Sequence, residues 1–197
     1  MANTTHLLWT DLETLGTDEN NNSIIEWASI LTDMDLEVIE TYGSVVRPRY
    51  QFWDFGLPPA VSKMHEANGL FSAIRHGQGV PLSVVEDRLI EMLQRHDVQG
   101  FVMLAGSGVG HFDMRFIQRQ TPKLAKLLAF SVVDVGVMRR FFRDVCHAGV
   151  MVPPDGDAAT KTHRAMDDIK QHLSEAKHYK SIISRMPITS MLPKPQT

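Results

Sequence analysis

Four carboxylates and one histidine, spread over most of the chain, have the residue types that metal-dependent chemistry requires. They are Asp11, Glu13, Asp113, His163 and Asp168. Hard cations such as Mg²⁺ and Mn²⁺ prefer carboxylate oxygens, and two such ions about 3.5–4 Å apart stabilise both the attacking and the leaving oxygen of a phosphodiester. A histidine beside them can take a proton from water. The set therefore suggests hydrolysis of a phosphodiester bond.

The first two carboxylates are expected on one face of a strand over His6–Glu13. Alternate side chains of a strand share a face, so Asp11 and Glu13 point the same way as Leu7 and Trp9. Two like charges beside apolar side chains are costly unless a cation compensates them. We therefore favour metal binding over an exposed polar edge, which is the commoner setting for an Asp-x-Glu sequence.

The other three residues, taken singly, have ordinary structural explanations. Asp113 could cap the helix that follows it. His163 could lie on the surface of a helix expected over Thr162–Ser184, and Asp168 could interact with the dipole of that helix. Residues five apart differ by about 140° around a helix, whereas His163 and Asp167 would nearly share a face. If Asp168 is a ligand, His163 must reach back from a frayed helix end.

The elements that must position these residues follow from the periodicity of the apolar side chains. Strands are expected at His6–Glu13, Ser23–Thr32, Glu37–Pro48, Phe101–Ala105 and Ser131–Val135. Helices are expected at Pro58–Glu66, Pro81–His96, Phe112–Arg119, Lys123–Leu128, Val137–His147 and Thr162–Ser184. The first three strands are predicted to be antiparallel, and the later alternation of strands and helices favours parallel strands covered by helices.

Composition narrows the class of protein. A chain of 197 residues with 43% hydrophobic content can form one compact domain, and its single cysteine excludes an intrachain disulfide. No stretch reaches the roughly 18 apolar residues that span a bilayer, so we expect a cytoplasmic protein with no membrane partner. The net charge of −3 argues against broad coating of nucleic acid. A nucleic-acid substrate should therefore be short or held locally.

The order and spacing of the five residues resemble the histidine-bearing branch of the DEDD 3′→5′ exonucleases. Within that superfamily the chain most resembles the oligoribonucleases, through Trp9–Glu13, Ile24–Glu26, Met64–Leu70, Val133–Val135 and His163–Ile169. The resemblance implies an α/β fold with a ribonuclease-H-like mixed five-stranded sheet flanked by helices. It also implies an exonuclease domain over residues 1–185, followed by a proline-rich tail over residues 186–197.

The resemblance implies a role for each of the five residues. Asp11, Glu13 and Asp168 would hold one Mg²⁺ or Mn²⁺ ion, and Asp11 with Asp113 would hold a second. His163 would be the general base, and the family pattern selects Asp168 rather than its neighbour as the ligand. The implied reaction releases nucleoside 5′-monophosphates from short single-stranded RNA, and relatives of this kind are commonly homodimers. The segment Val137–Phe142 offers apolar groups for such a contact, although a helix facing the core explains them equally well.

Four further residues are candidates for substrate binding: Leu15, Trp53, His65 and Asn68. His65 matches the histidine before the Gly-Leu pair of the family, and either this ring or Trp53 could stack on a base. Packing of Trp53 in the core is an equal alternative. Leu15 could wedge between the two terminal bases or make a plain loop contact. Asn68 stands where the family usually has a serine, and its polar side chain could still bind phosphate or ribose.

The chain departs from the oligoribonuclease pattern where a phosphate clamp is expected. Phe130, Ser131 and Gly136 stand in place of a tyrosine, an arginine and a serine. These residues do not replace the charge of a guanidinium, so longer strands are expected to be admitted. A 3′→5′ exonuclease acting on single-stranded DNA, or on both polymers, is therefore an alternative. An inactive nucleic-acid-binding module is disfavoured because all five catalytic residue types are present.

Overall fold

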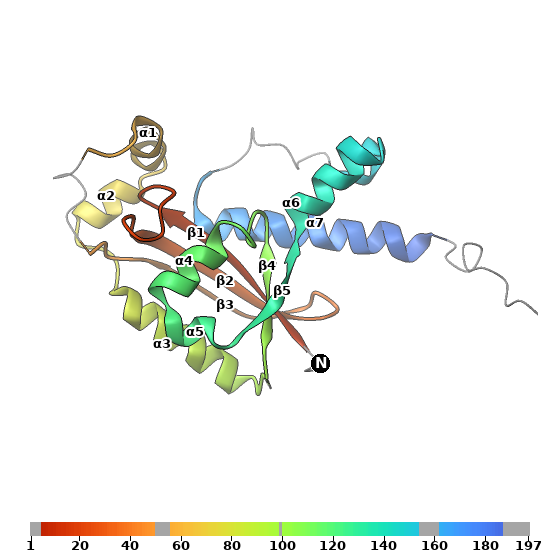
Figure 1. Ribbon diagram of the computed structural model, residues 1–197, viewed down its shortest axis with the longest axis horizontal. Coiled ribbons are helices and arrows are strands. Elements are labelled where there is room, and N and C mark those ends of the chain that lie inside the picture. The colour runs from red at the N-terminus through yellow and green to blue at the C-terminus, as the bar shows by residue number, and fades with distance from the viewer. Residues whose placement is uncertain (1–4, 50–55, 99, 154–161, 187–197) are drawn as a thin grey trace, which may run out of the picture.

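A mixed sheet forms the centre of the computed structural model, which describes residues 5–49, 56–98, 100–153 and 162–186. Its five strands have the order β3-β2-β1-β4-β5 (Figure 1). They are β1 (His6–Thr14), β2 (Ile24–Asp33), β3 (Val38–Val45), β4 (Val102–Gly106) and β5 (Leu128–Asp134). The first three are antiparallel neighbours, and β4 and β5 join β1 in parallel. The predicted mixed five-stranded sheet is therefore confirmed.

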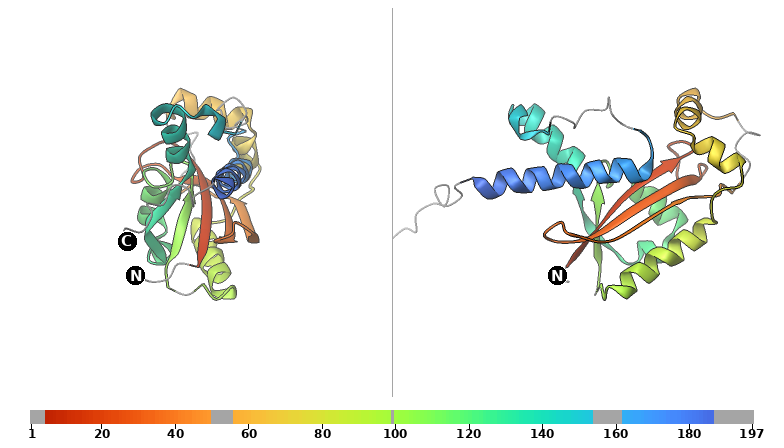
Figure 2. Two further views of the ribbon diagram at one scale, coloured as in Figure 1. Left: turned by 90° about the vertical axis from the view of Figure 1, so that its right-hand side faces the viewer. Right: turned by 180° about the vertical axis from the view of Figure 1, so that it is seen from behind.

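The central strand β1 has two different faces. Leu8 and Leu12 face an apolar core built with helices on one side of the sheet. These helices are α3 (Leu82–Arg95), α4 (Asp113–Gln120) and α5 (Pro122–Ala125). Leu7 and Trp9 face the long helix α7 (Ala165–Arg185), which crosses the other side of the sheet (Figure 2). The alternation predicted for β1 therefore also places Asp11 and Glu13 on the α7 face.

Helix α7 begins at Ala165, so the expected start at Thr162 is wrong. A tertiary contact sets this start, because the carboxylate of Glu26 in β2 accepts a hydrogen bond from the backbone N–H of Ala165 at 3.0 Å. A carboxylate at this place satisfies one of the unpaired N–H groups of the first turn and complements the helix dipole. Thr162 lies before the helix and donates to Asp167 instead.

Two other helical regions differ from the sequence expectation. A six-residue helix that was not predicted, α2 (Leu70–Arg75), follows α1 (Pro59–Ala67) after Gly69, whose φ of 79° is left-handed. Helix α6 (Val135–Arg140) begins two residues earlier than expected and passes into a π-helical turn at Phe141–Val145. The early start has a local cause, because the Asp134 side chain caps α6 by accepting the N–H of Val137 at 3.0 Å.

The C-terminal part of the domain prediction falls beyond the described residues. Helix α7 ends at Arg185, and among the described residues a short 3₁₀ turn at Gly149–Met151 precedes it. The division into residues 1–185 and 186–197 stays a prediction. Within the described ranges, no helix combines the length and the apolar composition needed to cross a bilayer.

Candidate active site

Two carboxylates lie at the end of β1, on the face that α7 covers. Glu13 is 6% exposed and Asp11 is partly buried. Glu13 stands directly opposite Glu26 of β2 in the sheet register. Like charges at such cross-strand positions destabilise a sheet unless they are compensated. This pair of glutamates therefore needs compensating positive charge.

Arg164 supplies that charge to Glu26. Its guanidinium donates to the Glu26 carboxylate through Nε at 3.0 Å and through a second nitrogen at 2.6 Å. This hydrogen bonding raises the pKa of Arg164, which stays charged. Because Glu26 is committed to Arg164 and to the first turn of α7, Glu13 is the carboxylate of this facing pair that remains directed into the site. The sequence interpretation gave Glu26 no role, although its place in a buried strand was a usable signal.

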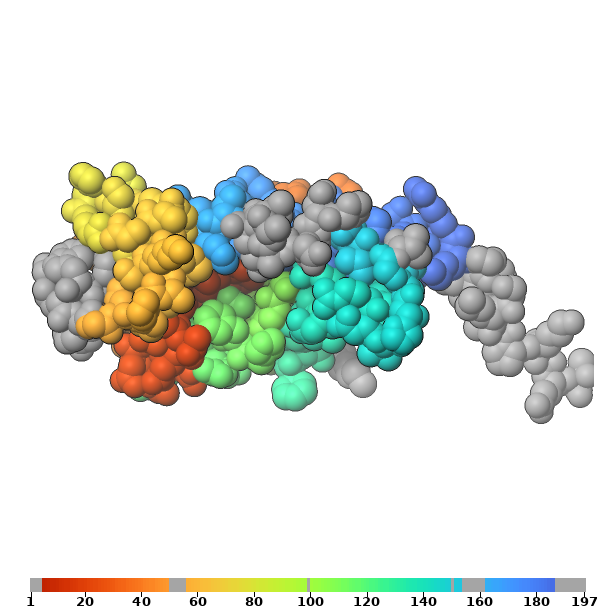
Figure 3. All heavy atoms as spheres, turned by 90° about the horizontal axis from the view of Figure 1, so that it is seen from above, coloured from red at the N-terminus to blue at the C-terminus, as the bar shows by residue number. Residues whose placement is uncertain are grey.

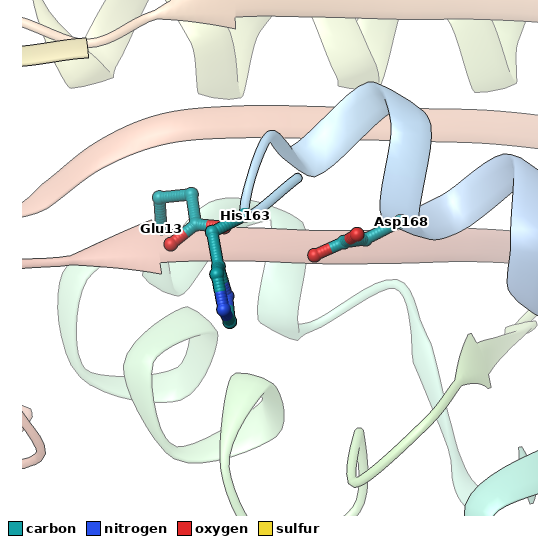
Figure 4. A group of neighbouring side chains, drawn as sticks. All are labelled: Glu13, His163 and Asp168. Atoms are coloured by element: carbon teal, nitrogen blue, oxygen red, sulfur yellow. The ribbon is translucent and has the colours of Figure 1, made fainter. Parts of the chain in front are cut away.

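Glu13 meets one residue from the segment that precedes α7 and one from the first turns of that helix. Each of Glu13, His163 and Asp168 offers one ligand atom, and these atoms all lie within 4.8 Å of one another. We call these three residues the carboxylate–histidine cluster. Figure 4 shows Asp168 extending from the first turns of α7 toward the other two residues, while the His163 ring hangs from the segment before the helix. Residues that are 150 positions apart in sequence are thus gathered at one end of β1.

His163 reaches the cluster because it lies outside the helix. Its φ of 50° is left-handed, which is uncommon for a residue other than glycine. The backbone carbonyl of His163 accepts a hydrogen bond from the Asn68 side chain, which holds this conformation from outside. The relative directions of the His163 and Asp168 side chains are therefore not set by helical periodicity. The sequence analysis required this if Asp168 is the ligand. Such strained residues concentrate at functional sites.

The two neighbouring aspartates of α7 have different environments. Asp168 is 3% exposed and belongs to the carboxylate–histidine cluster. Asp167 is exposed and accepts a hydrogen bond from the hydroxyl of Thr162 at 3.2 Å. Asp168, which the family pattern selects, is thus the buried member of the pair, and its role as a ligand stays a prediction.

Asp113 is the first residue of α4, and it is bonded to the strand that carries the other carboxylates. Its Oδ1 accepts the backbone N–H of Leu12 at 3.1 Å, so it lies beside the peptide between Asp11 and Glu13. The side chain is buried. Asp11 and Asp113 are not part of the 4.8 Å group found among the described residues. The site thus has a compact part at Glu13 and a second acidic part at Asp11 and Asp113.

The donor set fits a hard divalent cation. Four carboxylates converge where β1 ends, and oxygen donors of this kind suit Mg²⁺ or Mn²⁺ rather than soft metals. Several buried negative charges close together are costly without a cation. The acidic residues that would hold the metal are Asp11, Glu13, Asp113 and Asp168.

The candidate substrate residues have varied positions. His65 is fully buried, donates from Nε2 to the carbonyl of Thr14 at 3.1 Å, and lies 3.9 Å from Glu13. Burial is the main cause that lowers its pKa. Leu15 is also buried, in an apolar cluster with α2. Asn68 supports the His163 backbone. Trp53 lies outside the described residues.

A hollow opens beside His163, between α1 and the segment that precedes α7. Its volume is about 540 Å³, and its lining includes Lys63, Asn68, Thr162 and His163. Figure 3 looks down on this end of the molecule and shows the orange surface of α1 close to the light-blue surface of the start of α7. Because His163 lines the hollow, the hollow is adjacent to the carboxylate–histidine cluster.

The positions of the expected phosphate clamp do not line this hollow. Phe130 and Ser131 are exposed on β5, which is an edge strand. Gly136 is buried, and a Cβ atom built there would lie 2.5 Å from Oγ of Ser107 and 3.2 Å from Oδ1 of Asp134. The first distance is shorter than van der Waals contact allows. Ser107 therefore occupies the space that a side chain at position 136 would need.

Comparisons with known proteins identify the family of this chain. The family model for exonucleases of the RNase T type matches residues 8–175. The oligoribonuclease of Ectopseudomonas mendocina is 28% identical over 182 residues, which are 91% of this chain and 97% of that protein. The mitochondrial oligoribonuclease of Mus musculus is 28% identical over 181 residues, which are 90% of this chain and 73% of that protein.

A solved structure supports the fold. Exonuclease I of E. coli, in complex with a dA16 oligonucleotide, matches 92% of this chain with a TM-score of 0.69 and 17% sequence identity. The present chain spans only 42% of that longer chain. The likeness confirms the predicted ribonuclease-H-like α/β architecture.

Proposed function

The chain belongs to the exonuclease family, and from this premise we propose that it hydrolyses short single-stranded RNA from the 3′ end with two bound Mg²⁺ or Mn²⁺ ions. The observation that carries the proposal is the carboxylate–histidine cluster, in which three different segments bring ligand atoms within 4.8 Å of one another. Curated relatives of similar length are oligoribonucleases, which supports RNA as the substrate.

Each residue of the site has a distinct task in this proposal. Glu13 and Asp168 would hold one cation together with Asp11, and Asp113 would join Asp11 in holding the other. Bound cations would supply Lewis-acid stabilisation of the negative charge that develops on the phosphoryl oxygens. The imidazole of His163 would take a proton from the attacking water, as a general base. Asn68 would keep that imidazole in place through its bond to the His163 carbonyl.

The hollow beside His163 is the proposed place for the terminal nucleotide. Its volume of about 540 Å³ falls in the usual range for small-molecule sites. Lys63 is exposed at its lining and offers a positive charge to a phosphate in a protein that is negative overall. The substrate roles of Leu15, His65, Asn68 and Trp53 stay predictions.

Two broader expectations also remain proposals. A homodimer is supported by exposed apolar side chains on α6 and the turn that follows it, which include Val137, Phe141 and Val145. A cytoplasmic location is supported by the bacterial relative, although a mitochondrial protein is equally similar. Sedimentation of the purified chain and localisation of a tagged copy test these points.

The test of the function compares two matched variants on labelled substrates. Purified protein is incubated with Mn²⁺ or Mg²⁺ and 5′-labelled RNA or DNA of two to about twenty nucleotides. We expect stepwise shortening from the 3′ end, abolished in Asp168→Asn because a buried metal ligand is lost. Asp167→Asn makes the same chemical change at an exposed neighbour and should cost much less. Absence of metal-dependent cleavage in the parent, or the reverse ranking of the two variants, contradicts the proposal.

The same assay also measures how the cleavage rate depends on substrate length and on the sugar. Exposed Phe130 and Ser131 and buried Gly136 offer no guanidinium clamp for a 5′ phosphate. We therefore expect kcat/KM on a dinucleotide to exceed that on an RNA of five to ten nucleotides by less than about tenfold, roughly 1.4 kcal/mol in transition-state stabilisation. Equal cleavage of DNA would favour the alternative of an exonuclease on both polymers. A stall at longer chains would show that other groups rebuild the clamp.

A further inference from the structure

A third histidine, besides His65 and His163, lies on the site face of the sheet. His172 is in α7, one helical turn beyond Asp168, and only 2% of it is exposed. Residues four apart lie on the same side of a helix, so His172 and Asp168 both face the sheet. Nδ1 of His172 is 3.9 Å from Oδ1 of Asp11. The sequence interpretation gave His172 no role.

The register between α7 and β1 explains this contact. Toward the start of α7, Asp168 meets Glu13 at the end of β1. The step from Glu13 back to Asp11 covers about 6.7 Å along β1, which is close to the 5.4 Å rise of one turn of α7. Asp11 therefore meets the next turn of the helix, at His172. Farther along, Leu7 of β1 and Ala176 of α7 belong to one apolar cluster. His172 therefore stands at the boundary between the acidic site and the apolar core.

The imidazole of His172 at that boundary affects the Asp11 carboxylate. Burying an imidazole is costly unless its polar atoms interact, and an aliphatic side chain would fill this place without that cost. The separation of 3.9 Å is longer than a direct hydrogen bond, so the imidazole acts on Asp11 through a longer-range electrostatic interaction. It acts on Oδ1, one of the two oxygens of the Asp11 carboxylate. The imidazole thus favours one orientation of the Asp11 carboxylate.

We propose that His172 is a positioning residue for Asp11, which it holds from the helix side so that the carboxylate is oriented for a divalent cation. The inference rests on the proposed function, because it takes Asp11 as a metal ligand. Groups that orient a ligand from behind change metal affinity by about 10–100-fold when they are removed. His172 touches neither substrate nor the reacting water in this role, and its effect passes through Asp11.

The experiment measures Mn²⁺ binding without substrate. The parent, His172→Leu and His172→Asn are titrated with Mn²⁺ and followed by electron paramagnetic resonance of the free ion. Leucine fills the space but carries no polar atom, so Mn²⁺ affinity should fall by about tenfold or more. Asparagine places an amide nitrogen near the position of Nδ1, and it should recover affinity to within about threefold of the parent. Steady-state assays on RNA should show recovery of kcat in the same order.

A matched control uses another histidine of the same helix. His178 is half-buried beside Tyr179 and is six positions from His172. His178→Leu makes the same chemical change away from the acidic residues, so Mn²⁺ affinity should stay at the parent value. Thermal unfolding of each variant separates loss of the fold from loss of the site. If leucine at 172 prevents folding, His172→Ser removes the imidazole with less apolar volume and takes its place.

Two results would overturn the inference. Parent-like Mn²⁺ affinity in the folded leucine or serine variant would show that the imidazole does not act on Asp11. Equal impairment of the asparagine and leucine variants, together with lowered melting temperatures, would show a packing role alone. Failure of the proposed function looks different, because the parent itself would then neither bind Mn²⁺ nor shorten RNA.

Discussion

The two faces of β1 are built from the same nine-residue strand but differ in what they bury. On the α3 side, Leu8 and Leu12 pack in a continuous apolar core. On the α7 side, apolar packing at Leu7 and Trp9 gives way within two residues to Asp11 and Glu13. Apolar burial is favourable by itself, whereas buried charge is favourable only with partners. The first face should therefore determine stability, and the second should determine activity.

The largest expected effect tests the site face. Replacing His163 by Ala should lower kcat by about 10²–10⁴-fold because a general base is removed. The residue lies in a non-helical segment, so the free energy of unfolding should change little. Single-turnover assays and urea unfolding measure the two quantities. Mn²⁺ titration supplies the control, because an equal loss of metal affinity would make His163 a ligand rather than a base.

A substitution on the α3 face of the sheet should lower stability and leave activity nearly unchanged. Leu89 in α3 is fully buried in the apolar core. Leu89→Ala should lower the free energy of unfolding by about 2–5 kcal/mol, through lost transfer free energy and the cavity left behind. Well below the melting temperature, kcat should stay within about twofold of the parent. Val84→Ala, at an exposed position of the same helix, should leave both quantities nearly unchanged.

A smaller effect is expected at Glu26, which holds the segment that carries His163. Glu26→Gln keeps the shape of the side chain but removes the charge that binds Arg164 and the first turn of α7. Misplacement of His163 should then lower kcat by about tenfold, while KM changes little because no substrate contact is lost. Glu40→Gln disrupts an exposed ion pair with Arg95 far from the site and should leave kcat unchanged. A larger loss of kcat in Glu40→Gln than in Glu26→Gln would refute the inference that activity depends on the α7 face alone.

Period-two alternation made one part of the site predictable from sequence. A strand has only two faces, so the common direction of Asp11 and Glu13 followed directly from their spacing. The antiparallel start and the parallel addition of β4 and β5 also followed from local patterns and connection types. The order of all five strands did not, because it depends on which edges pair in the folded chain.

The approach of His163 to Asp168 could not be worked out from helical periodicity. It depends on a helix start fixed by Glu26, which lies 139 residues before Ala165, and on a left-handed φ stabilised by Asn68. Local propensity does not encode such tertiary contacts. The resemblance to a family supplied the choice of Asp168 that periodicity opposed. His172 was missed for the same reason, since its partner Asp11 belongs to a distant strand.

The contact between position 136 and Ser107 constrains how this chain can change over evolution. A Cβ gained at position 136 would lie 2.5 Å from Oγ of Ser107, which is the end of a side chain that can rotate. Any side chain gained at position 136 therefore requires Ser107 to adopt another rotamer or to be replaced by a smaller residue. The residues at positions 107 and 136 should accordingly co-vary over evolution.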